Sequence, residues 1–84
     1  MLFLQNRNME ALFTATINID DVDGVFEVIF DEEQYVFLPH AGNPQLPRFG
    51  IKREHDTWVE QQDLNPQIKQ QAVSALENYL LSQH

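Results

Sequence analysis

Two groups of acidic side chains are the residues of this 84-residue chain best suited to bind a cation. The segment Asp20-Asp21-Val22-Asp23-Gly24 resembles a tight carboxylate loop, whose oxygens calcium prefers. An EF-hand alignment on Gly24 fails, because Ile19 and Phe30 then take positions that require carboxylates. The second group, Asp31-Glu32-Glu33, lies about 20 Å farther along an extended strand, too far to share one ion. The sequence therefore predicts solvated hairpin tips and no metal site.

The histidines and serines are the remaining side chains with catalytic chemistry. His40, His55 and His84 are widely spaced, and none forms the HxxxH or ExxH pattern that presents two ligands on one helical face. Nucleophilic catalysis has little to use, because the chain has no cysteine and both serines, Ser74 and Ser82, fall in a predicted helix. The glycines match neither a dinucleotide fingerprint nor a phosphate loop. We therefore predict no catalytic residue and no cofactor, and we favour a protein that is not an enzyme.

The segment from Pro39 to Arg48 is the best place in the sequence for a small-molecule site. Three prolines and Gly42 predict a long loop, and long loops of compact domains often contact ligands. His40, Asn43 and Arg48 would supply the polar groups of a pocket beneath it. This segment supports an alternative hypothesis, a small-molecule-binding or catalytic domain.

The composition bounds the class of protein and its partners. A net charge of −8 with five lysines and arginines opposes binding to nucleic acid and to anionic membranes. Hydrophobic residues form 43% of the chain, which predicts a globular fold without a membrane span. The absence of cysteine and of a signal peptide favours the cytoplasm. The charge also supports another alternative, an acidic inhibitor of a basic partner protein.

Alternation of apolar and polar residues predicts four to five antiparallel strands in a meander. The clearest strand spans residues 13–19, and the turn at residues 20–24 has Gly24 to adopt a positive φ. The following strands are predicted at residues 25–30, 34–38 and 48–54, with a short fifth strand at Trp58 and Val59. A turn at Asp31-Glu32-Glu33 joins the second strand to the third.

An amphipathic helix is predicted to begin at Pro66, with Asn65 as its N-cap. Its apolar side chains occupy an arc of about 160°: Ile68, Ala72, Val73, Ala75, Leu76, Tyr79 and Leu80. The predicted class is therefore α+β, an antiparallel sheet with one C-terminal helix packed on one face. Residues 9–84 are predicted to form a single domain, with residues 1–8 disordered or loosely packed and Met9 as an alternative start.

One helix covers only one face of a sheet, yet both faces of the predicted strands carry apolar residues. Val25, Ile29, Tyr35 and Phe37 are predicted to face away from the helix. Large apolar patches are uncommon on monomers, so the cover would be residues 2–4, curvature of the sheet, or a second chain. The leading hypothesis is a small intracellular protein-interaction domain that forms a homodimer through this second face.

Overall fold

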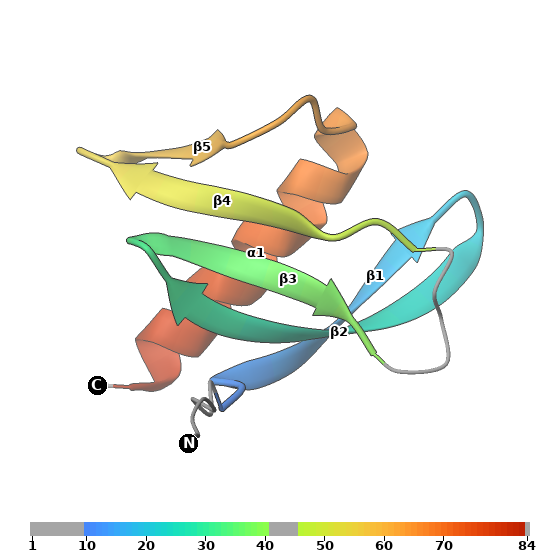
Figure 1. The fold of residues 1–84 in the computed structure, drawn as a ribbon, viewed down its shortest axis with the longest axis horizontal. Helices are drawn as coiled ribbons and strands as arrows, with labels where there is room; N and C mark the ends of the chain where they lie inside the picture. The colour runs from blue at the N-terminus through green and yellow to red at the C-terminus, as the bar shows by residue number, and fades with distance from the viewer. Residues whose placement is uncertain (1–9, 41–45, 84) are drawn as a thin grey trace, which may run out of the picture.

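Five strands form one antiparallel sheet in chain order, and a single helix crosses one face of that sheet (Figure 1). The computed structural model describes residues 10–40 and 46–83. The elements are β1 (Phe13–Ile19), β2 (Val22–Asp31), β3 (Gln34–Pro39), β4 (Phe49–Glu54), β5 (Thr57–Glu60) and α1 (Pro66–Ser82). The predicted α+β meander with a C-terminal helix is confirmed. The predictions for residues 1–8 and Met9 lie outside the described residues.

The β1–β2, β2–β3 and β4–β5 hairpins are each closed by a turn of two residues. Asp20 and Asp21 have φ angles of 53° and 67°, and Glu32 and Glu33 have the same pair of values. Two successive positive φ angles define the turn whose twist matches that of antiparallel strands. In the third hairpin, His55 has a φ of 57°. The strands therefore pair directly up to each turn.

The predicted position of the first turn was wrong. Gly24 lies inside β2 and pairs with Ile17, and the turn consists of Asp20 and Asp21. A Cβ at Gly24 would meet a terminal methyl group of Leu46, which would have to move, and the glycine has no positive φ. Asp31 likewise belongs to β2, which leaves two residues in the second turn instead of three.

Replacing Glu33 by glycine is expected to raise the free energy of unfolding by about 0.5–1 kcal/mol. Left-handed backbone costs a residue with a Cβ roughly 1–2 kcal/mol, and the greater freedom of glycine in the unfolded chain offsets part of the gain. Urea denaturation measures the difference. Glu54→Gly removes the same charge from extended backbone in β4 and should destabilise by about 0.5–1 kcal/mol. Equal losses in both variants would contradict the positive φ at Glu33.

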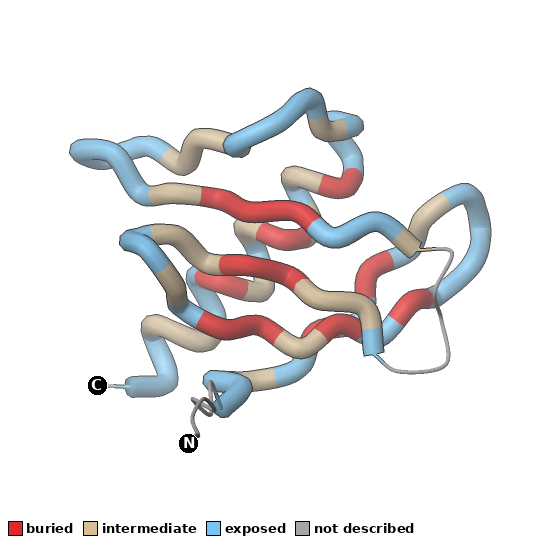
Figure 2. The backbone as a smooth tube through the Cα atoms, in the orientation of Figure 1, coloured by how far each residue is buried: buried red, intermediate tan, exposed pale blue. Residues whose placement is uncertain are grey.

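The hydrophobic core lies between the sheet and α1 (Figure 2). The helix begins as predicted, because the Asn65 side chain accepts a hydrogen bond of 2.7 Å from the Gln67 amide and Pro66 needs no partner there. Its buried residues are Ile68, Ala72 and Leu76. On the sheet, the fully or almost fully buried side chains are Ile17, Phe26, Val28, Phe37, Phe49 and Ile51.

The helix contacts β1 through a polar side chain and through an aromatic pair. The Gln71 side chain accepts a hydrogen bond of 2.8 Å from the Asn18 amide and donates one of 2.9 Å to the Asn18 carbonyl. The rings of Phe13 and Tyr79 stack with their centroids 4.6 Å apart. These contacts place α1 alongside the outermost strand of the sheet.

Candidate interaction surfaces

The pairing of β2 with β3 decides which side chains face the helix. Residues directly opposite each other in an antiparallel pair point to the same side of the sheet. Phe37 lies opposite Val28, and Tyr35 lies opposite Phe30, so all four point to the helix side. The prediction that Tyr35 and Phe37 face away from the helix was therefore wrong. A turn one residue shorter than expected shifts the register by one, and such a shift exchanges the two faces of a strand.

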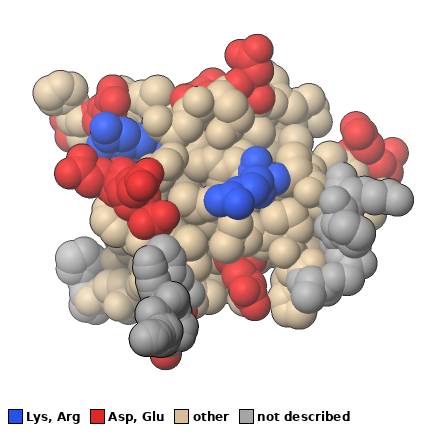
Figure 3. Space-filling view, in the orientation of Figure 1, with Lys and Arg blue, Asp and Glu red and all other residues tan. Residues whose placement is uncertain are grey.

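The face of the sheet away from α1, called the open face below, carries Val25 and Ile29 as predicted. On β3 it carries Val36 and Leu38 in place of the expected aromatic residues. Neutral side chains occupy most of this face, while acidic side chains lie towards its rim (Figure 3). Ile29 and Val36 are only 9% and 7% exposed, whereas Val25 is 39% exposed. The open face thus presents less apolar area than the sequence predicted.

Polar side chains pack over the open face at Gly50. Any side chain there would collide with the Gln34 amide oxygen, which lies directly over the glycine. The Gln62 side chain accepts a hydrogen bond of 3.2 Å from the Gly50 amide. A shallow pocket lies between these groups, with Arg48 and Val36 also in its wall. Within the described residues, the Gln34 oxygen has no hydrogen-bond partner.

The structure places two of the three candidate ligand residues of the loop. His40 is exposed, and its Nε2 lies 3.7 Å from a carboxylate oxygen of Glu27. Arg48 lines the pocket beside Gln34. Asn43 lies outside the described residues. His40 and Arg48 thus contact different neighbours, and the small-molecule site beneath this loop stays a prediction.

Both acidic groups lie at hairpin tips, and the first of them forms hydrogen bonds with Asn18. Asp23 accepts a hydrogen bond of 2.9 Å from the Asn18 side chain, which in turn accepts one from the Asp21 amide. Across residues 10–40 and 46–83, no three His, Asp or Glu side chains gather closely enough to hold a metal ion. Over the same residues, no helix has the length and apolar character needed to cross a bilayer.

A second apolar surface lies on the helix side of the sheet, near the C-terminal end of α1. We call it the aromatic patch; its members are Phe30, Tyr35, Arg53, Trp58, Leu80 and Leu81. Phe30 is 52% exposed and Leu81 is 71% exposed. The rings of Tyr35 and Phe30 have centroids 4.9 Å apart, and Tyr35 meets Trp58 edge-on at 5.9 Å. The patch therefore extends across the sheet from β2 to β5.

Trp58 is held in place by neighbours on three sides. Its indole Nε1 donates a hydrogen bond of 3.3 Å to Glu77 on the helix, and the Arg53 guanidinium lies 4.7 Å from the centre of its ring. Tyr35 contacts the ring from the sheet. A cation over an indole face is favourable by about 0.5–1 kcal/mol at exposed sites. Trp58 is thus an ordered anchor in a half-buried position.

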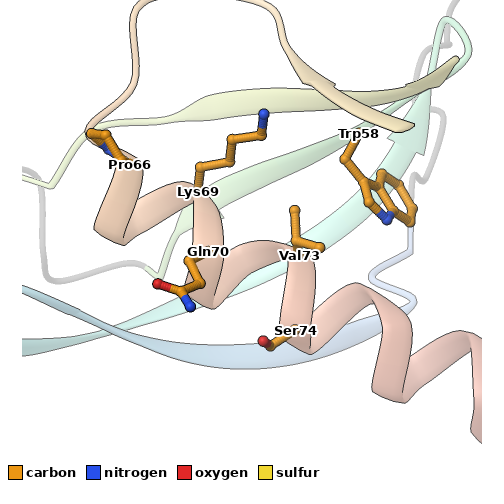
Figure 4. A pocket seen from close by; sticks show the side chains of 6 residues that line it. All are labelled: Trp58, Pro66, Lys69, Gln70, Val73 and Ser74. Carbon is orange, nitrogen blue, oxygen red and sulfur yellow. The ribbon is translucent and has the colours of Figure 1, made fainter. Parts of the chain in front are cut away.

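A groove between β5 and the start of α1 continues from Trp58 (Figure 4). Trp58 and Val73 lie opposite each other across it, and Pro66 closes the far end. At its side, the Lys69 ammonium donates a hydrogen bond of 2.8 Å to the Glu60 carboxylate. This hydrogen bond lowers the pKa of Glu60 below its ordinary value. The groove combines apolar walls with one neutralised ion pair.

Sequence reasoning did not find the aromatic patch. The sequence places Trp58 on a short strand and Leu81 in the last turn of the helix, with 22 residues between them. A tryptophan on an edge strand is the only local signal, because the grouping depends on the register of four strands. No protein-family model, no curated protein and no solved structure matches this chain.

Proposed function

We propose that this chain is a small non-enzymatic interaction domain that binds another protein through the aromatic patch. The observation that carries the proposal is the exposure of Phe30 and Leu81 beside an ordered tryptophan. Tryptophan, tyrosine and arginine are the residues most enriched where protein interfaces concentrate their binding energy. Tyr35, Arg53 and Trp58 supply one of each.

The rim of the patch defines the chemistry of the partner. Acidic residues follow Phe30 and Arg53 in the chain: Asp31 and Glu54 end strands β2 and β4, and Glu32, Glu33 and Asp56 lie in the turns after them. Acidic groups around an apolar centre favour a partner with apolar side chains flanked by lysine or arginine. The net charge of −8 would speed such an association at low salt. The proposal thus joins the interaction hypothesis with that of an acidic protein bound to a basic partner.

Replacing Phe30 or Leu81 by serine is expected to weaken partner capture at least roughly tenfold, the factor that about 1.4 kcal/mol corresponds to. Both side chains are exposed, so the unfolding midpoint should stay close to that of the parent chain. Affinity capture from a lysate of the source organism, quantified by mass spectrometry at several salt concentrations, measures the loss. The capture of true partners should also decline as salt rises.

Val22→Ser is the matched control for these two variants. Val22 is 57% exposed, and it lies beside the Asp20-Asp21 turn, away from the patch. Its replacement removes similar exposed apolar area and should leave partner capture unchanged. Equal retention of the same proteins by all three variants would show that the patch is not the binding surface.

The homodimer predicted from the sequence through the open face stays a prediction. Val25 is the most exposed apolar residue of that face, but Ile29 and Val36 already lie largely buried within the chain. Two of its four expected members, Tyr35 and Phe37, belong to the other face. The area left for face-to-face packing is correspondingly smaller, and self-association has a better basis elsewhere in the sheet.

A further inference from the structure

The outer edge of β1 carries backbone groups that no residue of 10–40 or 46–83 pairs. Along a strand, successive residues direct their N–H and C=O groups to opposite sides. The Val25 carbonyl accepts a hydrogen bond from the His40 amide on the β3 side, so the neighbouring Gly24 and Phe26 are bonded to β1. Their partners are Ile17 and Ala15. Thr16 lies between these two residues of β1, and Thr14 and Asn18 lie beside them. The N–H and C=O groups of these three residues therefore point outward.

Three residues of β1 point outward in this way, and Asn18 is the one that another described residue pairs. The outward groups of Asn18 both bond to the Gln71 side chain, which confirms the alternation. No described residue bonds to the outward groups of Thr14 and Thr16. Within the described part of the chain, these four groups form a short stretch of sheet edge without a partner.

Two of the devices that normally prevent strand addition, charge and proline, are absent from β1, and the Gln71 side chain of the helix covers its edge at Asn18. Proteins protect sheet edges with lysine, proline, bulges or very short strands. The sequence of β1, Phe13-Thr14-Ala15-Thr16-Ile17-Asn18-Ile19, has no charge and no proline over seven residues. At the opposite edge, β5 has four residues, and its Glu60 side chain is paired with Lys69. The two edges of the sheet therefore differ in how well they are protected.

A groove runs along this unprotected edge between β1 and α1. It is lined by Phe13, Thr14, Ala15, Thr16, Ala75, Asn78, Tyr79 and Ser82. Every one of these side chains is uncharged, on a chain whose net charge is −8. A basic partner would find no carboxylate here, whereas two copies of the chain can meet without placing acidic side chains against each other.

We propose that two copies of this chain associate through the outer edges of β1. The strands would run antiparallel about a two-fold axis at Ala15, so that Thr14 of each copy pairs with Thr16 of the other. In this register, four N–H···O=C hydrogen bonds form between the two strands, and they pair the four unpaired groups of each copy. The contact of Asn18 with Gln71 stays intact. The opposed threonines are a favourable cross-strand pair.

The resulting dimer has one continuous sheet of ten strands, with both helices on the same side. Two of the side chains that line the groove, Ala15 on the strand and Ala75 on the helix, are small. The edge strand β5, which carries Trp58, lies at the far side of each sheet. The dimer would therefore display two aromatic patches, and a bivalent partner would bind more tightly than a monovalent one.

Sedimentation equilibrium on the full chain over a wide concentration range tests the proposal. The parent chain should show a reversible monomer–dimer equilibrium, and Thr16→Pro should raise its dissociation constant about 10- to 100-fold, because it removes two of the four hydrogen bonds. Proline is tolerated where an edge strand directs its N–H to solvent, so the monomer should still fold. Thr16→Val keeps the N–H group and should dimerise like the parent chain.

Hydrogen exchange of the parent chain provides a measurement that needs no variant. The amides of Thr14 and Thr16 should gain protection as concentration rises, whereas that of Asn18, bonded to Gln71 within the chain, should not change. A parent chain that stays monomeric up to about millimolar concentration, or a dimer in which both threonine amides exchange freely, would overturn the proposal. If Thr16→Pro abolishes the dimer and the monomeric variant still binds its partner through the aromatic patch, the result supports this proposal independently of the proposed function.

Discussion

Leu76→Ala is expected to lower the free energy of unfolding by about 2–5 kcal/mol, the range measured for buried leucines. Leu76 is 0% exposed and lies in the core between α1 and the sheet, with Ile17 and Val28 in the same cluster. Alanine is the best helix former, so the helix itself gains from the change and the whole loss comes from packing. A small native domain has roughly 5–15 kcal/mol of stability, and this single change removes a large part of it. Urea or thermal denaturation followed by circular dichroism measures the loss.

Leu81→Ala is the control for that measurement, because it makes the same chemical change in the same helix. Leu81 is 71% exposed, so its replacement should alter stability by no more than about 0.5 kcal/mol. If Leu76→Ala and the control unfold at the same temperature or urea concentration, α1 does not pack on the sheet through this side chain.

Local signals in the sequence predicted the helix and the strand order. Asn65 and Pro66 marked the start of α1, and all three residues that it buries belong to the predicted apolar arc, whose other four members are half-buried. The alternation in residues 13–19 predicted both ends of β1 correctly. These features succeed because each depends on neighbours within a few positions along the chain.

Turn length and the faces of β3 were not predictable in the same way. Asp20-Asp21 and Glu32-Glu33 lack the glycine or asparagine that normally marks a two-residue turn with positive φ angles. Strand β3, with Tyr35, Val36, Phe37 and Leu38 in succession, is apolar on both faces, so its own pattern gives no orientation. The face is decided by cross-strand pairing, and an error of one residue in the turn reverses it.

The candidate surfaces depend on that same pairing. The aromatic patch brings together residues of β2, β3, β4 and β5 with the end of α1, and no short motif in the sequence predicts their proximity. The unpaired groups on the edge of β1 follow from the directions of its backbone groups, which the His40–Val25 hydrogen bond and the contact of Asn18 with Gln71 reveal. Composition had supplied the charge argument for both surfaces, but not their positions.

Phe37→Ala is expected to lower the free energy of unfolding by about 3–5 kcal/mol, and it tests the face of β3 directly. Phe37 is 0% exposed, stacks on Phe49 with ring centroids 4.8 Å apart, and meets Phe26 edge-on at 6.4 Å. Leu38→Ala changes the adjacent residue, which is half-buried on the open face, and should cost about 1 kcal/mol. A reversed register would exchange the two losses, because Leu38 would then occupy the core.

A double-mutant cycle between Phe37 and Phe49 separates the register from general damage to the core. Stacked aromatic pairs contribute about 0.5–1.5 kcal/mol beyond the area that they bury. The losses in Phe37→Ala and Phe49→Ala should therefore fall short of additivity in the double variant by about that amount. The stacking requires Phe37 to lie opposite Phe49 on the helix side of β3 and β4. Strictly additive losses would mean that the two rings do not contact each other, as expected if Phe37 lay on the open face.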